Sequence, residues 1–596
     1  MEKKLEELNF TLKSLREKVM EWKIADERRE FLRQLYPFIR DGEERYPDLG
    51  DVLTPEEIEC LLFDCATWKD CCNEAANKFV EFVTVSGYML KPDVDVDGEP
   101  ILRRSTPVHE AAKNGSVPRC KMINYLCQIY GYVNYIGEDG YTHFHAACQY
   151  NDDELHAVEM FLKLRRMDPN NCLLPKTGDS PLHLALMERP HQLAPLKLLL
   201  YGADPNVANA RGLTPLHCIC NSGPVDEWFL VLFFEIAARL SNRPVKVDVA
   251  DDSGRTPLHL ALANGDMSTT AFLLRHGANP NRANEAGETA LHAVCKYPRQ
   301  LIIMTSDYSE FDSTQALFEH SHERYWPLRV DARDNEGRTP LQWAVANHTP
   351  DALQVLLDHG ADLAGFVYPA ANHCDDEEDC ERMIDVKSRQ LLGALLCAER
   401  LAERGYELTR GDALQIMRLF ARHGFFEGAD VDLRSSLLEN EAFASRARKL
   451  TVNKDVLLHD VIQLRRAEEV NKRVTYEDMF DFVNNDVSRF EFDKVGAEEA
   501  CPLYLCEIMS RRFFQSWALE PFWKMIRYRL PLEMCEIILG NLKNEDLYKI
   551  CLADQVQEDS KKDATASVTK CDSNKRPRES EDQEAPKKAK IYYEEH

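Results

Sequence analysis

Histidine and cysteine are the residue types whose spacing could carry chemistry in this chain. Histidine recurs in a repeated phrase close to Thr-Pro-Leu-His. The 19 cysteines stand singly or as Cys71-Cys72 and Cys218-x-Cys220. Zinc and redox sites require C-x-x-C pairs or similar spacing, which the sequence lacks. We therefore expect reduced thiols of an intracellular protein.

An acidic run, "CDDEEDCE" from Cys374 to Glu381, contains residue types that bind metals. His373 stands just before the run, and Cys380 lies within it. Adjacent carboxylates repel one another and point in different directions, so the run favours a solvated linker over a metal site. We place this linker at residues 369–384.

Motifs of the common catalytic sites do not occur in the sequence. It contains no G-x-x-x-x-G-K-[ST], no H-E-x-x-H and no G-x-S-x-G. We therefore expect a protein that is not an enzyme, without a cofactor or a metal.

The histidines belong to an internal repeat whose units begin 33 to 50 residues apart. The hydroxyl of Thr or Ser can cap a first helix, proline suits its first turn, and glycine can end a second helix. The seven openings are Thr106, Thr142, Ser180, Thr214, Thr256, Thr289 and Thr339. Six units carry a histidine three residues on: His109, His145, His183, His217, His259 and His292. The seventh has Gln342, and Gly202, Gly277 and Gly360 are the helix-ending glycines.

This pattern resembles the ankyrin repeat, and the resemblance covers seven repeats at residues 96–368. It implies helix-turn-helix units that stack into a curved solenoid, because one unit cannot bury its apolar side alone. In this family the histidine braces the turn by bonding backbone groups, so its role is structural.

Two units carry insertions, around "DEWFLVLFFEIAARLSNRPVKVD" in repeat four and "KYPRQLIIMTSDYSEFDSTQALFEHSHERYW" in repeat six. Longer repeat helices packed on their neighbours are the favoured interpretation. A contact specific to the target protein is the alternative.

Residues 1–95 are predicted to be helical and to cap the solenoid. A leucine stripe occurs at three and four residue spacing, and Thr54, Pro55 and Glu57 form a capping box. The stripe is too short for a stable coiled coil of its own, so packing on the repeats is favoured.

Residues 385–552 return to helical periodicity and form a second predicted domain, which makes the whole chain all-α. Gly405 and Gly424 stand where helices end. The stretch "LQIMRLFARHG" could be a decayed eighth repeat. The aromatic cluster "FFQSWALEPFWKMIRY" is expected to contribute to the core.

The last apolar stretch, "LPLEMCEIILGNLKNEDLYKIC", has the spacing of two short helices. Pro531 suits a first turn, and Asn544 is expected to cap the second helix. The first helix has an apolar stripe of Met534, Ile537, Ile538 and Leu542, and the second has Leu547, Ile550 and Cys551. Closing the helical domain is one role for this pair.

Together with the repeats, the stretch resembles the PRANC domain, the F-box-like module of ankyrin proteins of poxviruses, parasitoid wasps and wasp symbionts. The resemblance implies that the pair docks a Skp-type adaptor of a cullin-RING ubiquitin ligase, with Leu530 and Pro531 at the F-box opening. A full F-box continues through a further helix, whereas this chain contains no Leu after Leu552.

The tail at 553–596 is polar and charged, so we expect it to be disordered. Two basic clusters in it resemble a bipartite nuclear import signal read by an importin-type receptor. They are Lys575, Arg576 and Arg578, followed by Lys587, Lys588 and Lys590. The alternative is a solvated charged tail. We expect a location in the nucleus, the cytoplasm or both.

The net charge of the chain restricts the kinds of molecule that it is expected to bind. With 73 Lys plus Arg against 100 Asp plus Glu, the formal charge of -27 opposes binding to nucleic acid or anionic lipid. No apolar segment suits a signal peptide or a membrane span, so we expect a soluble protein. The favoured function is an adaptor that binds a target protein and recruits a ligase. The alternative is an ankyrin scaffold or inhibitor that sequesters a signalling or transcription factor.

Overall fold

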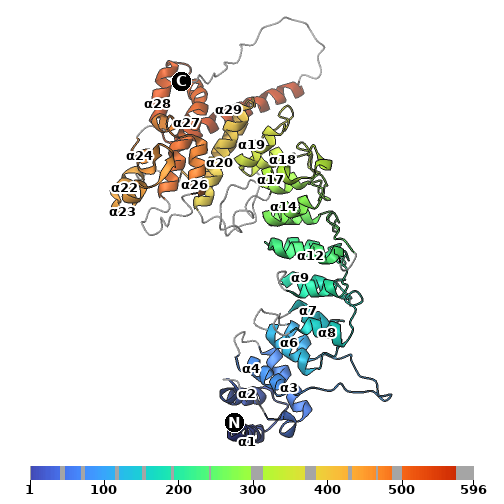
Figure 1. The fold of residues 1–596 in the computed structure, drawn as a ribbon. Helices are drawn as coiled ribbons and strands as arrows, with labels where there is room; N and C mark the ends of the chain where they lie inside the picture. The colour runs from blue at the N-terminus through green and yellow to red at the C-terminus, as the bar shows by residue number, and fades with distance from the viewer. Residues whose placement is uncertain are drawn as a thin grey trace. The chain divides into compact units, whose positions relative to one another are not determined.

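The computed structural model describes residues 2–40, 47–68, 74–113, 120–150, 156–188, 193–239, 243–296, 313–369, 384–426, 433–464, 467–485 and 500–571. The chain divides into two compact units, Met1–Pro369 and Ala370–His596. Nearly all regular structure in the described residues is helical, which confirms the predicted fold class (Figure 1).

The first unit begins with helices that precede the repeats: α1 (Glu2–Lys18), α2 (Ala25–Ile39), η1 (Leu49–Asp51), α3 (Pro55–Thr67) and α4 (Glu74–Val85). The predicted capping box is present, since the Thr54 amide donates to Glu57 Oε2 at 2.8 Å and the Glu57 amide to Thr54 Oγ1 at 3.3 Å. Helices α3 and α4 pack on α5 and α6 as one repeat packs on the next. The solenoid therefore starts one helix pair earlier than the repeated phrase indicates.

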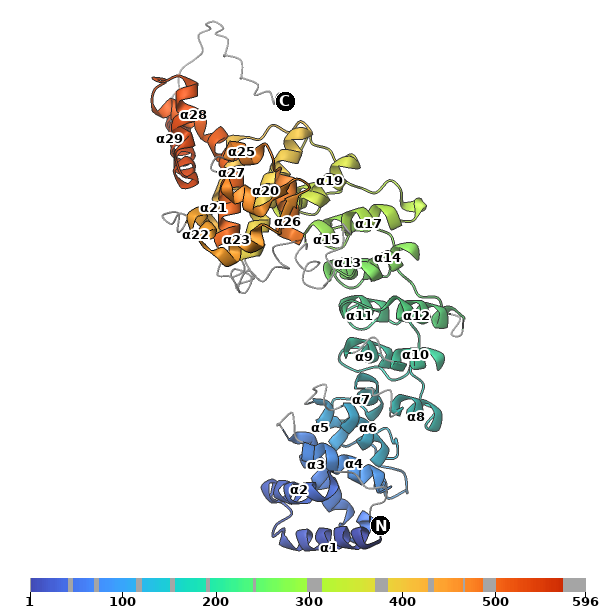
Figure 2. The ribbon, with the colours of Figure 1, turned by 60° about the vertical axis from the view of Figure 1, so that its left-hand side comes forward.

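The repeats form two columns of helices (Figure 2). The inner column consists of α5 (Pro107–Lys113), α7 (His143–Gln149), α9 (Pro181–Glu188), α11 (Pro215–Asn221), α13 (Pro257–Ala263), α15 (Ala290–Lys296) and α18 (Pro340–Ala346). The outer column consists of α6 (Cys120–Ile129), α8 (Ala157–Leu164), α10 (Leu193–Leu200), α12 (Glu227–Arg239), α14 (Met267–Arg275), α17 (Ser313–His320) and α19 (Pro350–Asp358). A short 3-10 helix, η3 (Glu323–Tyr325), follows α17. Leucines such as Leu258 and Leu273 fill the core between the columns.

The insertion in repeat four is a longer outer helix, as favoured from the sequence. Helix α12 has 13 residues, whereas α10 has 8. Its Phe229 and Phe233 are buried in the stack. Residues 297–312 of the insertion in repeat six lie outside the described residues.

The second unit is built around one long helix, α27 (Ala500–Met525). The elements before it are α20 (Ile384–Glu403), α21 (Arg410–Arg422), α22 (Leu433–Glu439), α23 (Glu441–Ala447), β1 (Thr451–Asn453), β2 (Val456–Leu457), α24 (Leu458–Gln463), α25 (Ala467–Asn471) and α26 (Tyr476–Asn485). Two helices follow it, α28 (Leu532–Gly540) and α29 (Asn544–Cys571). Helices α20, α25, α28 and α29 all pack on α27.

A small antiparallel hairpin, β1–β2, corrects the prediction that this domain lacks strands. The helical periodicity predicted for residues 385–552 does not hold here, since Val456 and Leu457 pair with β1 and the helix begins at Leu458. The β-branched residues Val452 and Val456 favour extended backbone on either side of a tight turn. In that turn the Asp455 amide donates to Asn453 Oδ1 at 3.1 Å.

Helix α29 corrects the prediction of disorder from Ala553, because it continues to Cys571. Asp554 forms an ion pair with Arg410 of α21, and Arg418 donates to Gln555 at 2.8 Å. These contacts join residues more than a hundred positions apart, so the polar composition of the segment does not reveal them. Residues 572–596 lie outside the described residues.

Candidate functional site

Each repeat histidine forms hydrogen bonds within its own repeat and to the next repeat, and we call this arrangement a histidine joint. His183 Nδ1 accepts the Ser180 amide at 3.2 Å, and His183 Nε2 donates to the Leu213 carbonyl of the next repeat at 2.9 Å. Because Nδ1 faces an N–H group, the proton must lie on Nε2, and the ring is neutral. The other five acceptors are the carbonyls of Tyr141 for His109, Cys172 for His145, Arg255 for His217, Glu288 for His259 and Arg338 for His292, at 2.9 to 3.2 Å.

Burial lowers the pKa of all six histidines below the ordinary value. Both ring nitrogens are occupied by backbone groups, so these imidazoles are not available for proton transfer. In repeat seven Gln342 repeats the arrangement, since Oε1 accepts the Thr339 amide at 3.0 Å and Nε2 donates to the Val367 carbonyl at 3.2 Å. The predicted structural role is confirmed.

The turns between repeats are also joined to one another through their backbones. The Asp252 amide donates to the Arg211 carbonyl at 3.0 Å, and the Glu285 amide to the Ser253 carbonyl at 3.0 Å. Gly254 has φ +72°, and a Cβ atom there would lie 2.6 Å from the Glu285 nitrogen. Such close approach leaves little room for chemistry at the turns.

The turn between α27 and α28 is fixed by an aromatic pair. The indole N–H of Trp523 donates to the Leu530 carbonyl at 2.9 Å, and the Trp523 and Tyr528 rings lie 4.7 Å apart at 88°. Arg527 and Tyr528 adopt φ of +55° and +61°, which side chains other than glycine seldom adopt. The turn therefore holds the start of α28 in one conformation.

Helix α28 has a buried side and an exposed apolar side. Cys535 and Leu539 are buried, and Arg511 of α27 donates to the carbonyl of Gly540 at 3.0 Å. Met534 is 47% exposed and Ile537 is 61% exposed, although both are large and apolar. Leu530 and Pro531 are also exposed at the start of this helix. We call Leu530, Pro531, Met534 and Ile537 the docking surface.

The remaining predicted partner-binding residues are less accessible. Ile538, Leu542 and Ile550 are half-buried. Leu547 is fully buried and Cys551 nearly so, because α29 packs on α27 and α21. The prediction that Leu547 contacts a partner is therefore wrong. Helical spacing identified the shared face, but that face of α29 is turned toward the core.

Asn544 corrects a second prediction, that it caps α29. Its side-chain amide donates instead to the Glu507 carbonyl and to Ser510 Oγ of α27, both at 3.0 Å. Lys543 holds the cap position, and its amide donates to Asp546 Oδ2 at 3.3 Å.

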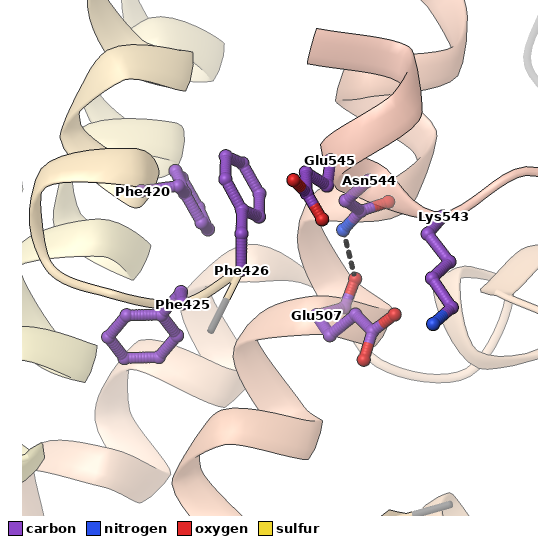
Figure 3. A pocket seen from close by; sticks show the side chains of 7 residues that line it. All are labelled: Phe420, Phe425, Phe426, Glu507, Lys543, Asn544 and Glu545. Carbon is purple, nitrogen blue, oxygen red and sulfur yellow. Dashed lines mark hydrogen bonds between the residues drawn. The ribbon is translucent and has the colours of Figure 1, made fainter. Parts of the chain in front are cut away.

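A small pocket lies where α21, α27 and the start of α29 meet (Figure 3). It is lined by Phe420, Phe425, Phe426, Glu507, Lys543, Asn544 and Glu545. The Asn544 bond to Glu507 crosses it, and the Phe426 ring stacks on Tyr548 at 5.7 Å. Three phenylalanine rings and the Asn544 amide, which bonds to the backbone, line this pocket. The pocket is therefore a place where these helices pack against one another.

Sequence reasoning missed three exposed apolar residues beside the docking surface: Met525, Tyr528 and Leu532. Their signal was weak, since they follow no helical spacing and lie in or next to a turn. The import residues Lys575, Arg576, Arg578, Lys587, Lys588 and Lys590 lie outside the described residues, so their role stays a prediction.

Metal and membrane sites find no support in the described parts of the chain. Among those residues, no group of three His, Cys, Asp or Glu side chains is placed to hold a metal ion. The acidic run at 374–381 lies outside them. Across the described ranges, no helix combines the length and hydrophobicity needed to cross a bilayer.

Paired helices stacked in two columns, joined by backbone-bonded turns, define a repeat protein of the class that binds other proteins. Models of the ankyrin repeat match residues 109–208, 182–282 and 227–305 in three overlapping copies, and a single-repeat model matches 336–364. Residues 109–305 and 336–364 of the chain are therefore ankyrin repeats.

Known proteins are similar to part of this chain. It is 28% identical over 188 residues to human (Homo sapiens) transient receptor potential cation channel subfamily A member 1, covering 31% of this chain and 15% of that protein. It is 29% identical over 183 residues to the B-cell lymphoma 3 protein homolog of Mus musculus, covering 27% and 40%. The chain thus spans less than half of the length of each of these relatives. The solved ankyrin repeat domain of Bcl-3 is 22% identical, with a TM-score of 0.30, and covers 38% of this chain and 89% of that domain.

Proposed function

We propose that this protein is a recruiting adaptor without catalytic activity of its own. Its ankyrin repeats bind a target protein, and its docking surface binds a Skp-type adaptor of a cullin-RING ubiquitin ligase. The observation that carries the proposal is the exposure of Met534 and Ile537 on a helix whose other side is firmly packed.

A rigid, exposed apolar helix face suits a partner's groove. Exposed apolar side chains grouped on one element mark interaction sites, and a few buried anchors carry most of the affinity of such interfaces. The bond from Trp523 to Leu530 and the bond from Arg511 to Gly540 fix both ends of α28. Binding then requires little ordering of the chain, which favours affinity.

The docking surface is smaller than the sequence predicted. Ile538 and Leu542 remain at its edge, half-buried, while Leu547 and Cys551 support it from the core. The proposed contact therefore rests on the first helix of the F-box-like pair and on the turn before it.

A second candidate is a scaffold or inhibitor that holds its target without a ligase. Similarity to the B-cell lymphoma 3 protein homolog, 29% identical over 183 residues, favours this candidate. The solved Bcl-3 domain is described as a member of the IkappaB protein family. The two candidate functions differ in whether the chain binds a Skp-type adaptor, so measuring that binding distinguishes them.

The test measures binding of the purified full chain to a purified Skp-type adaptor by calorimetry. Met534→Asp with Ile537→Asp is expected to weaken binding at least tenfold, because carboxylates placed in an apolar interface cost several kcal/mol. Val556→Asp is the matched control, since Val556 is also 61% exposed but lies on α29 outside the docking surface. Equal binding by the double variant would remove the docking role, and no binding by the unaltered chain would favour the scaffold.

A further inference from the structure

The connection between α4 and α5 extends into a two-stranded ribbon at residues 93–101. The Asp95 amide donates to the Glu99 carbonyl at 2.8 Å, and the Ile101 amide donates to the Asp93 carbonyl at 2.7 Å. Every residue of the ribbon is exposed. In Figure 1 it is the long blue loop that projects beside α3. We call residues 93–101 the first finger.

The first finger is longer than the corresponding turns of the later repeats. Those turns close with the same kind of backbone bond, for example from the Asp251 amide to the Arg255 carbonyl at 2.9 Å. There the capping residue Thr256 follows at once, whereas Thr106 stands seven residues after Glu99. Stacking of the repeats does not require this added length, so the first finger is free to serve another purpose.

The two faces of the first finger differ in character. Side chains alternate between the faces of a ribbon, and residues paired across it share a face. Val94 pairs with Pro100, so this face is apolar, and the Val94 side chain is 60% exposed. Asp93, Asp95 and Glu99 lie on the other face. The finger therefore offers an apolar row beside an acidic row.

One edge of the ribbon is open and the other is closed. On the open edge, the amide and the carbonyl of Val94 form no hydrogen bond with any residue that the structure describes. On the closed edge, Pro100 has no N–H group, and the Leu102 carbonyl accepts the Ile136 amide at 2.8 Å. A further strand would therefore pair with the edge at Val94. A ribbon of two strands is marginally stable alone and gains from a third strand.

We propose that the first finger binds an extended, basic segment of a partner protein as a third strand along the Val94 edge. In such a segment every second side chain lies beside Asp93 and Asp95, and the side chains between them lie beside Val94. Lysine or arginine alternating with apolar residues therefore matches both faces. The inference rests on the proposed binding of a target by the repeats, and it specifies which kind of target segment this end of the solenoid recognises.

Charge favours this occupant over the others. The acidic face repels nucleic acid and anionic lipid, and the formal charge of -27 on the whole chain adds to this repulsion. A second copy of the finger paired edge to edge would place carboxylates beside carboxylates, which destabilises a strand pair. A neutral or acidic segment would gain the backbone hydrogen bonds without the ion pairs.

The test measures binding of the full chain to a labelled synthetic peptide, Lys-Val-Lys-Val-Lys-Val-Lys, by fluorescence anisotropy. The control peptide has the same composition in the order Lys-Lys-Lys-Lys-Val-Val-Val, so it carries the same charge without the alternation. We expect the alternating peptide to bind roughly tenfold more tightly, because only this peptide matches both faces at once. Equal binding of the two peptides, or no binding of either, would overturn the proposal.

Variants of the chain locate the binding site. Val94→Pro removes the N–H group of the open edge without changing the charge, and Asp93→Asn with Glu99→Gln removes two carboxylates of the acidic face. Each change is expected to weaken binding of the alternating peptide by roughly five- to tenfold. The matched control, Glu138→Gln with Glu285→Gln, removes two exposed carboxylates from other turns and should leave binding unchanged.

Two further results decide the outcome. Unchanged peptide binding by the Val94→Pro variant, with native circular dichroism, would overturn the proposal. None of these variants alters the docking surface, so binding of the Skp-type adaptor should stay the same in calorimetry. Adaptor binding thus tests the proposed function separately from the role of the first finger.

Discussion

The indole N–H of Trp523 donates to the carbonyl oxygen of Leu530 at 2.9 Å, and so ties the end of α27 to the first residue of the docking surface. Trp523→Phe keeps a smaller aromatic ring but removes the indole N–H donor. We expect adaptor binding to fall by about three- to tenfold, in line with a lost hydrogen bond of about 1 kcal/mol. Calorimetry with the purified adaptor measures it. Trp517→Phe, on the same helix but away from the turn, is the control. If both variants weaken adaptor binding equally, the turn has no specific role in binding.

The loss of stability on replacing a turn glycine should depend on whether another turn packs against that glycine. Gly254→Ala places a Cβ 2.6 Å from the Glu285 nitrogen, whereas Gly337, at φ +80° in the last such turn, has no heavy atom within 4 Å of that position. Both variants incur the left-handed backbone cost of about 1 kcal/mol. We expect Gly254→Ala to lower the free energy of unfolding by clearly more than Gly337→Ala. Urea unfolding of the two variants checks this, and equal midpoints would contradict it.

Stability should fall with acid because of the repeat histidines. Their folded pKa lies below the ordinary value of about 6.5, so the unfolded chain binds more protons in this range. The stability is fully present above about pH 6.5 and is lost as pH falls from there toward the lower folded pKa values. Thermal unfolding at intervals from pH 7.5 to 5 measures the slope.

One variant isolates the histidine contribution. His183→Gln copies the bonds of Gln342 in repeat seven while removing one titrating group. Its slope with pH should be shallower than that of the unaltered chain, at little cost near pH 7.5. An unchanged slope would assign the acid sensitivity to other groups.

The basic clusters of the tail give a prediction about location. Lys587, Lys588 and Lys590 changed together to Ala should shift the protein out of nuclei, because the remaining cluster binds its receptor weakly alone. Fluorescence imaging of tagged chains checks the distribution. An unaltered distribution would make the tail a solvated segment only.

Local signals predicted the repeat architecture well because each acts within a few residues. Thr or Ser opens each unit, a histidine stands three residues on in six of the seven, and a glycine ends the second helix in several, so His259 and Gly277 could be assigned without any distant contact. The second unit depends on long-range packing instead. The inward turn of Leu547, the bond of Asn544 to α27 and the ion pair of Asp554 with Arg410 are set by helices far away in sequence. Spacing shows which residues share a face, but it does not show which way the face is turned.

The histidine joints give the solenoid a direction. Each imidazole bonds forward, to a carbonyl of the following repeat, so peeling the stack from its last repeat would release the joints in order, and each freed ring would regain its ordinary affinity for protons. At acid pH the freed rings would then become protonated, and this protonation would oppose restacking of the repeats. The end from which such peeling starts carries Gln342, an amide that cannot gain a proton in this range, so the first joint of the series is insensitive to acid.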